Sequence, residues 1–200
     1  MKNLTRRFVK GIGALLMAFA FLALSLAAVP EARANLITNG DFETGDFTGW
    51  LAIPLGGGLE VNQDKPHNGH YAASFNAKGP LVDLAIQFNI PTTAGKFYTM
   101  DFWLAHDTSA RDNDFWAYWN GRLLKSLSHS DEGSFGYTRY SIDMQAKGST
   151  SYIAFAGRDA DGAYYLDDVR VTPVPEPATL ILLGVGLAGL GTRFASRRPE

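Results

Sequence analysis

Residues 35–172 of this 200-residue chain are predicted to form an all-β antiparallel sandwich. Three observations predict that fold class. Apolar residues come in short alternating runs, helical periodicity is absent over any useful length, and Gly, Asn, Asp and Pro interrupt the runs. Roughly eight or nine strands at such spacing are typical of a two-sheet sandwich. The expected strands are 50–53, 70–76, 81–90, 97–105, 113–119, 122–127, 135–144, 150–157 and 163–172.

Turn-forming residues separate these strands in chain order. Glycine permits the positive φ of tight turns, and proline cannot donate to a strand ladder, so both mark strand ends. The chain leaves the domain through a stiff, extended linker at 172–177, where each proline fixes its own backbone and restricts the residue before it. The turns are Gly56-Gly57-Gly58, Asn68-Gly69, Lys78-Gly79-Pro80, Thr93-Ala94-Gly95, Asn120-Gly121, Lys147-Gly148 and Asp161-Gly162.

Residues 1–34 have the three parts of a secretory signal peptide, predicted to be helical. An apolar core at about 12–29 is followed by Ala32-Arg33-Ala34, small residues at the positions that signal peptidase reads. We predict cleavage after Ala34, which makes Asn35 the mature N-terminus, by ordinary secretion rather than twin-arginine export. An uncleaved membrane anchor is the alternative. The positively charged start consists of Lys2, Arg6, Arg7 and Lys10.

Residues 173–200 form a second targeting segment, at the C-terminal side of the domain. Val174-Pro175-Glu176-Pro177 precedes an apolar run at 178–191, which is shorter than the roughly 20 residues that span a bilayer comfortably. Such a helix inserts marginally, and the arginines that follow it stay on the cytoplasmic side, so the domain lies across the membrane. A permanent single-pass anchor and transient retention are both open. The basic residues after the run are Arg193, Arg197 and Arg198.

The charge of the domain differs from that of the whole chain. The chain has 18 basic and 20 acidic residues, but eight of the basic residues and only three of the acids lie outside 35–173. The domain keeps 10 basic and 17 acidic residues, a charge of about −7. This charge excludes nucleic acid as a partner and suits divalent cations or neutral ligands. The absence of cysteine excludes thiol catalysis and cysteine-based zinc sites.

Strand alternation sorts the aromatic residues of two strands into an inner and an outer set. In 97–105, one face is apolar throughout, which turns Asp101 and Trp103 to the other side, together with Phe97. In 113–119, Trp116 and Tyr118 point outward. The predicted core positions are Tyr98, Met100, Phe102 and Leu104 in the first strand and Phe115, Ala117 and Trp119 in the second.

These outward residues form a candidate ligand-binding face. We expect the two strands to be hairpin neighbours joined by 106–112, which places Trp103, Trp116, Tyr118 and Asp101 on one surface. Aromatic rings stack on the C–H faces of sugars and carboxylates hold the hydroxyl groups, so this set suits a neutral carbohydrate. Two alternatives are burial of the rings under a loop and a bulge that reverses the parity of one strand.

No pattern of a transition-metal or catalytic site appears in the domain. His67 and His70 are three residues apart, a spacing that does not converge on strands and turns, and His106 and His129 stand alone. A nucleophile elbow, a metalloprotease helix and a phosphate loop are all missing from the sequence. We therefore predict a domain without enzymatic activity.

Three segments resemble known families. Residues 35–43, followed by Gly49-Trp50, resemble the first strand of galactose-binding-like jelly rolls, the fold of many carbohydrate-binding modules. Residues 165–171 resemble the last strand of that fold. The tail at 174–198 resembles the PEP-CTERM sorting signal, which exosortases handle in Gram-negative bacteria. The resemblance implies a jelly-roll domain between a signal peptide and a sorting signal.

The jelly-roll resemblance also implies a structural calcium ion. In that fold the first and last strands lie near each other and share the ion, and the matching side chains here are Glu43 and Asp168, with Asp41 and Asp167 in reserve. The segment 67–70 precedes a strand that often lends carbonyl oxygens to such a site. Calcium prefers oxygen ligands of this kind. Ordinary turn acids are the alternative interpretation.

The resemblance to both families implies an exported, non-catalytic surface or matrix protein. We expect an inner-membrane intermediate with the domain in the periplasm, exosortase processing near Pro175-Glu176-Pro177, and delivery to the cell surface or extracellular matrix. The expected ligand is carbohydrate such as exopolysaccharide. A matrix protein that acts by self-assembly is the alternative, and a polysaccharide-active enzyme is the third hypothesis.

Overall fold

The computed structural model describes residues 34–108, 112–128 and 133–175. The described residues up to Val174 form one compact unit. The predicted signal peptide before Ala34 and the sorting segment after Pro175, including Glu176, Pro177, Arg197 and Arg198, lie outside the described residues. In the described ranges, the structure contains no helix with the length and apolar character needed to cross a membrane.

The described part of the chain is all-β, as predicted. Nine of its ten strands correspond to the expected ones, and the exception is β2, a four-residue strand directly after the glycine-rich turn at 56–58. The strands are β1 (Leu51–Ile53), β2 (Leu59–Asn62), β3 (Ala72–Phe75), β4 (Asp83–Pro91), β5 (Phe97–His106), β6 (Asn113–Trp119), β7 (Arg122–Ser128), β8 (Phe135–Gln145), β9 (Thr150–Asp159) and β10 (Tyr164–Pro173).

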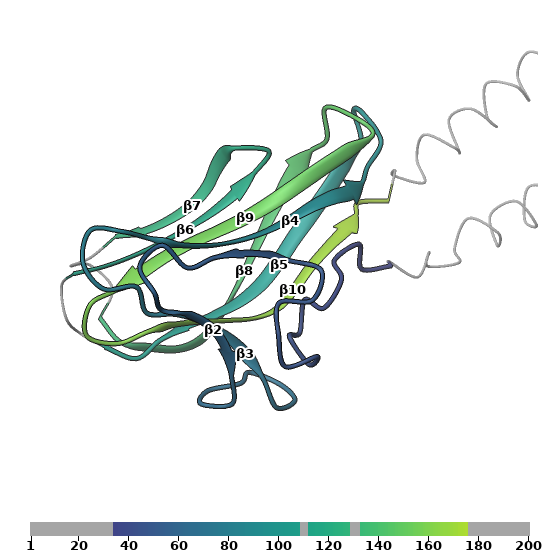
Figure 1. The fold of residues 1–200 in the computed structure, drawn as a ribbon. Helices are drawn as coiled ribbons and strands as arrows, with labels where there is room; N and C mark the ends of the chain where they lie inside the picture. Colours follow the sequence, from purple (N-terminus) through teal and green to yellow (C-terminus); the bar gives the residue numbers. More distant parts are fainter. Residues whose placement is uncertain (1–33, 109–111, 129–132, 176–200) are drawn as a thin grey trace, which may run out of the picture. The chain divides into compact units, whose positions relative to one another are not determined.

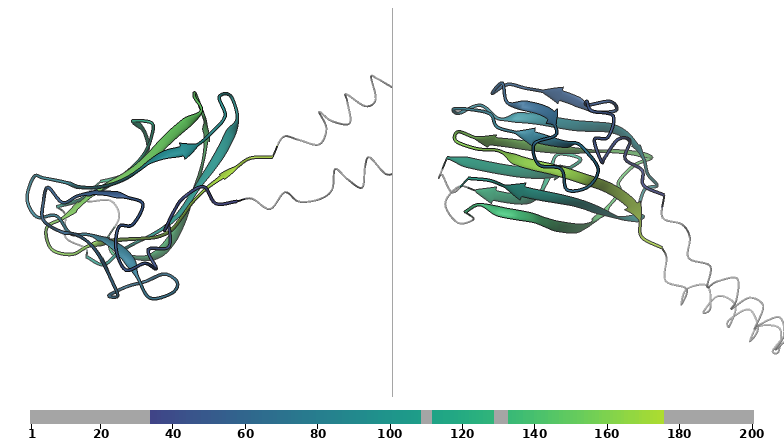
Figure 2. Two further views of the ribbon diagram at one scale, coloured as in Figure 1. Left: turned by 45° about the vertical axis from the view of Figure 1, so that its right-hand side comes forward. Right: turned by 90° about the horizontal axis from the view of Figure 1, so that it is seen from below.

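The strands form two antiparallel sheets that lie as two layers in Figure 1. Sheet A has the order β1-β4-β9-β6-β7, and sheet B has the order β2-β3-β10-β5-β8. The view from below shows the long strands running side by side (Figure 2). Chain neighbours pair directly in the β2–β3 and β6–β7 hairpins. Asn120 and Gly121 both have positive φ, 48° and 77°, as a type I′ turn between β6 and β7 requires.

The inner faces of the two sheets form one hydrophobic core. The alternation expected for β5 and β6 is confirmed, because the inward residues of both strands are at most 4% exposed. Phe155 of β9 packs its ring against Phe102 of sheet B and Phe115 of sheet A, with centroids 5.2 and 5.9 Å apart. Each fully buried ring contributes about 1.5–3 kcal/mol to folding.

The N-terminal segment of the domain lies along β10. Leu36 donates its amide to the Val171 carbonyl (2.9 Å), and Val169 donates to the Gly40 carbonyl (2.8 Å). At Gly40 the approach is so close that a Cβ atom would lie 2.1 Å from the Val169 carbonyl oxygen. A glycine is therefore required where this segment passes over the last strand.

Candidate functional site

The structure separates the four predicted ligand residues into two surfaces. Strand β5 pairs with β8 and β10 in sheet B, whereas β6 pairs with β7 and β9 in sheet A. The expected β5–β6 hairpin is therefore wrong, because the two strands belong to different sheets. Trp103 and Asp101 lie on the outer face of sheet B, and Trp116 and Tyr118 lie on the outer face of sheet A.

The outer face of sheet A carries two cross-strand rows of apolar side chains. Trp116 is opposite Ala156, which is opposite Leu84 on the other side. Tyr118, Ala154 and Ile86 form the next row in the same register. The alanines are at most 7% exposed, while the larger side chains beside them are partly exposed. We call this surface the aromatic face; it consists of Leu84, Ile86, Trp116, Tyr118, Ala154 and Ala156.

The two ends of the aromatic face differ in chemistry. At one end Phe88 contacts Tyr152, with ring centroids 5.4 Å apart. At the other end Arg158 bridges Asp114 (2.7 Å) and Asp112 (2.9 Å), and the hydrogen bonds that it donates to Asp114 raise the pKa of the guanidinium. An apolar strip thus ends in a fixed group of hydrogen-bonding side chains. Such a surface offers stacking along its length and polar contacts at one end.

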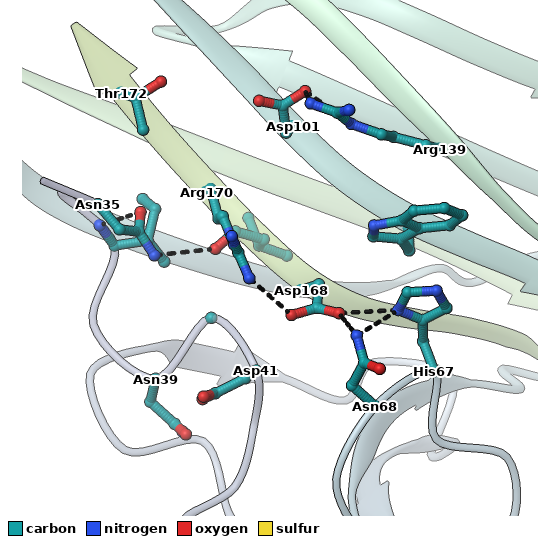
Figure 3. A pocket seen from close by; sticks show the side chains of 14 residues that line it. Asn35, Asn39, Asp41, His67, Asn68, Asp101, Arg139, Asp168, Arg170 and Thr172 are labelled. Carbon is teal, nitrogen blue, oxygen red and sulfur yellow. Dashed lines mark hydrogen bonds and ion pairs between the residues drawn. The ribbon is translucent and has the colours of Figure 1, made fainter. Parts of the chain in front are cut away.

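The outer face of sheet B carries a polar pocket of 640 Å³ (Figure 3). Its floor comes from β5, β8 and β10, and the N-terminal segment and the loop at 67–68 border it. We call it the sheet B pocket. It is lined by Asn35, Ile37, Asn39, Gly40, Asp41, His67, Asn68, Asp101, Trp103, Arg139, Asp168, Val169, Arg170 and Thr172.

Trp103 is held in a fixed orientation at this pocket. The His67 ring stacks on it with centroids 4.0 Å apart and planes 19° apart, and Tyr137 meets His67 edge-on at 4.9 Å. Beside the ring, Arg139 donates from Nε and Nη2 to one oxygen of Asp101, at 3.2 and 2.8 Å. Two of the predicted ligand residues therefore lie in one pocket, next to arginines that the sequence analysis did not single out.

Three of the four predicted metal-ligating acids, Glu43, Asp167 and Asp168, contact the loop at 67–71. Glu43 accepts hydrogen bonds from the amides of His70 (2.7 Å) and Tyr71 (2.9 Å), which hold its pKa below the ordinary value. Asp168 lies 2.8 Å from Nδ1 of His67. Asp41 lies across the sheet B pocket from Asp168 (Figure 3).

Two of these acids, Asp167 and Asp168, are adjacent and have opposite pKa shifts. Burial raises the pKa of Asp167 to about 6. Three backbone amides donate to its carboxylate and lower the pKa, but burial has the larger effect. Burial also acts on Asp168, but hydrogen bonds from His67, Asn68 and Arg170 outweigh it and lower the pKa.

A cation fits the charge of this group, because crowded carboxylates repel one another and calcium prefers oxygen ligands. Glu43 and Asp168, with Asp167, would hold the ion. In the structure, backbone N–H groups of the loop at 67–71 face these carboxylates. Calcium binding would therefore require this loop to turn its carbonyl oxygens toward the ion. Calcium binding stays a prediction.

The histidines are placed in ways that their spacing did not predict. Nδ1 of His67 and the carboxylates of Asp167 and Asp168 lie within 4.8 Å of one another, whereas His70 is not part of that group. His106 is fully buried and bonds Asp159 at 2.8 Å, a pair that the sequence analysis missed. His129 lies outside the described residues.

The ends of the described domain are attached to sheet B. The side-chain oxygen of Asn35, the predicted mature N-terminus, accepts hydrogen bonds from the amides of Ile37 and Val171, both at 3.1 Å. At the other end, Val174 donates its amide to the Phe97 carbonyl at 2.9 Å. Ala34 is exposed directly before this attachment.

Comparison with known proteins adds one sequence motif and one relative. Residues 173–198 match the PEP-CTERM protein-sorting motif. Over 189 residues, 86% of the chain, the sequence is 25% identical to the exoglucanase XynX of Acetivibrio thermocellus. The chain spans only 17% of that protein's length.

Solved structures share the fold of the domain. TmCBM61, solved with β-1,4-galactotriose, superposes with a TM-score of 0.54 at 17% identity and covers 70% of this chain and 99% of its own. The CBM22-1 xylan-binding domain of Paenibacillus barcinonensis Xyn10C gives 0.52 at 14% identity, over 74% and 99% of the two chains.

A tailspike domain shares the fold of this chain to a similar degree. The enzymatically active domain of tailspike protein 4 of bacteriophage CBA120 gives a TM-score of 0.54 at 13% identity, over 70% of this chain and 21% of its own. The carbohydrate-binding modules are matched over nearly their whole length, whereas the tailspike is matched over a fraction. The chain therefore carries a PEP-CTERM protein-sorting motif at 173–198 after a domain with the jelly-roll fold of carbohydrate-binding modules.

Proposed function

We propose that this protein is an exported, non-catalytic carbohydrate-binding protein whose aromatic face binds a neutral polysaccharide such as exopolysaccharide. The observation that carries the proposal is the pair of adjacent outward rings, Trp116 and Tyr118, beside a floor of two small, shielded alanines. Outward positions on a sheet are not needed for the core, and rings there cost solubility unless something covers them. A flat sugar chain is a suitable cover.

The chemistry of the aromatic face matches the two kinds of surface on a sugar ring. The C–H face stacks on indole and phenol rings, and Ala154 and Ala156 leave room for the ring between Trp116 and the aliphatic side chains of β4. The hydroxyl groups at the polar end meet Arg158 and its carboxylate partners. The net charge of about −7 favours a neutral chain over an acidic one.

The named ligands of the structural neighbours, galactotriose and xylan, supply the first probes. Binding of β-1,4-galactan and xylan to the purified full-length protein is measured by affinity electrophoresis and calorimetry. Trp116→Ala is expected to weaken binding about tenfold or more, since a buried aromatic ring contributes about 1.5–3 kcal/mol.

The matched control is Phe97→Ala, which removes a 53% exposed ring at the start of β5, far from the aromatic face in the strand order. This variant is expected to bind as the original protein does. Equal losses in both variants, or tight binding by Trp116→Ala, would exclude the aromatic face as the site.

The sorting motif supports a route of export and processing for this protein. We infer signal-peptidase cleavage after Ala34, insertion of the C-terminal helix with the domain in the periplasm, and exosortase processing near Pro175 before delivery to the cell surface or matrix. Intact-mass analysis of the mature protein tests this route. A product that still contains residues 178–200 would mean a permanent anchor instead of processing.

Self-assembly into a matrix is the second candidate, and one observation favours it. Leu51, Phe88 and Leu123 on the same side of sheet A are each about half exposed, so a second copy could cover the surface that we assign to sugar. Sedimentation velocity distinguishes carbohydrate binding from self-assembly. If the protein assembles with increasing concentration, Trp116→Ala abolishes this assembly and no glycan binds, self-assembly is the function of this surface.

A further inference from the structure

The sheet B pocket is separated from the aromatic face by the whole thickness of the domain. The pocket opens on the outer side of β5, β8 and β10, whereas the aromatic face is the outer side of β4, β9 and β6. The hydrophobic core lies between the two sheets, which in sandwiches pack about 10 Å apart before outer side chains are counted. A single sugar unit cannot contact both surfaces, so the pocket needs its own explanation.

The sheet B pocket contains both hydrogen-bond donors and hydrogen-bond acceptors, as a carbohydrate site requires, and they lie on neighbouring strands. In the register of sheet B, Trp103 is opposite Arg139, and Asp101 is opposite Arg170. The side chain of Asp101 is only 16% exposed, and both hydrogen bonds that Arg139 donates to it fall on Oδ1. Among the described residues, Oδ2 accepts no side-chain hydrogen bond, so it is available to a sugar hydroxyl.

The two arginines of the pocket keep free donor capacity. Arg139 and Arg170 have side chains that are 57% and 59% exposed, and within the described ranges the Arg170 guanidinium has one ion pair, a long one to Asp168 at 3.3 Å. Arginine has five N–H donors in a fixed plane, which suits pairs of neighbouring hydroxyl oxygens. Because His67 covers one face of Trp103, the ring is already held in place before any ligand arrives.

The charge of the pocket selects for a neutral ligand. Three carboxylates line it, those of Asp41, Asp101 and Asp168, against the two guanidinium groups. Together with the negative charge of the domain, this lining disfavours uronates, sulfates and phosphates. The volume of 640 Å³ lies within the roughly 300–1,000 Å³ of small-molecule pockets, enough for one or two sugar rings.

We propose that the sheet B pocket is a second carbohydrate site, for a neutral chain end or side branch, so that one domain binds two glycan chains on opposite faces and cross-links them. This inference rests on the proposed function of the aromatic face. The N-terminal segment at 35–41 and the loop at 67–68 border the pocket on two sides (Figure 3), so a long chain cannot lie across it as it can across an open sheet.

The test uses the full-length protein and two kinds of probe. Methyl glycosides of glucose, galactose, mannose, xylose and arabinose imitate chain ends, and β-1,4-galactan and xylan are the extended chains. Calorimetry gives the number of sites, and agglutination of polysaccharide-coated beads reports cross-linking. The variants are Asp101→Asn, which keeps the shape of the side chain, and Trp116→Ala, with Phe97→Ala as the control.

We expect a methyl glycoside to bind the original protein and Trp116→Ala alike, and to bind Asp101→Asn at least tenfold more weakly. Each of the two variants should keep one site and lose bead agglutination, while Phe97→Ala keeps both. Circular dichroism confirms that each variant is folded.

Three outcomes overturn the inference. Binding of none of the methyl glycosides, or loss of all binding in Trp116→Ala with no change in Asp101→Asn, would leave the aromatic face as a single site. Loss of all binding in Asp101→Asn alone would make the pocket the single site and remove cross-linking. Absence of any glycan binding in the original protein would instead contradict the proposed function itself.

Discussion

The outer faces of the two sheets belong to one sandwich, yet they have opposite chemistry. On sheet A, the outward residues of β4, β9 and β6 are mostly aliphatic or aromatic, and the charged group is confined to one end. On sheet B, two carboxylates and two guanidinium groups lie around Trp103 in the pocket, those of Asp101, Asp168, Arg139 and Arg170. Both faces share the same core, so stability of the core does not explain the difference. The proposal of two ligand-binding surfaces accounts for it.

The largest expected effect comes from breaking the link between the two sheets. His106 of β5 and Asp159 at the end of β9 form a fully buried pair, and the second oxygen of Asp159 accepts the amides of Asp161 and Gly162. His106→Ala leaves the buried Oδ2 of Asp159 without its histidine partner, which costs about 3–5 kcal/mol of unfolding free energy. Urea denaturation measures this cost.

The pair joins a strand of sheet B to a strand of sheet A. His106→Ala should therefore lower the melting temperature of the domain without a selective effect on binding at one of the two faces. Glycan binding by the remaining folded protein should be unchanged at both surfaces. A loss below about 1 kcal/mol would mean that the pair is dispensable, and selective loss of one site would show that His106 positions that site.

A calcium ion would bind at sheet B and stabilise the whole domain against unfolding. If Glu43, Asp167 and Asp168 hold the ion, calcium at a hundred times its dissociation constant adds about 2.7 kcal/mol to the unfolding free energy. The measurement is the melting temperature of chelator-treated protein with and without calcium. Glu43→Gln is expected to remove the effect, and an unchanged melting temperature would leave these acids as hydrogen-bonding groups alone.

Alternation predicted the faces of the strands correctly but not their partners. The inward and outward residues of β5 and β6 follow from period two, which is a local property of the chain. Whether the next strand joins the same sheet depends on packing of the whole core, and here β5 and β6 belong to different sheets. The sequence therefore predicted Trp103 and Trp116 as outward but placed them wrongly on one surface.

Long-range polar pairs were beyond the reach of the sequence analysis for a similar reason. His67 meets Asp168 across 101 residues, and His106 meets Asp159 across 53. Neither spacing corresponds to a strand or helix period, so no local pattern indicates them. The short strand β2 was missed because its four residues follow a glycine-rich turn and alternate too briefly to be distinguished from a loop.

A smaller effect, confined to sheet B, is expected from Gly40→Ala. The added methyl group would lie 2.1 Å from the Val169 carbonyl oxygen, so the N-terminal segment must move away from β10. Overpacking of this kind costs about 1–3 kcal/mol. Methyl glycoside binding in the sheet B pocket should weaken, while polysaccharide binding at the aromatic face stays unchanged. Equal weakening of both would mean that the segment supports the whole domain.

The smallest effect on stability is expected at the pocket's own ion pair. Arg139 bonds Asp101 from two nitrogens, but its side chain is 57% exposed, and exposed pairs contribute about 0–1 kcal/mol. Arg139→Gln should therefore leave the urea midpoint nearly unchanged and still reduce methyl glycoside binding about tenfold. Arg122→Gln, an exposed arginine on β7 of sheet A, is the control. If Arg139→Gln lowered stability by several kcal/mol and kept its binding, the charged groups of the sheet B pocket would be a structural feature, and the contrast between the two faces would have no bearing on ligands.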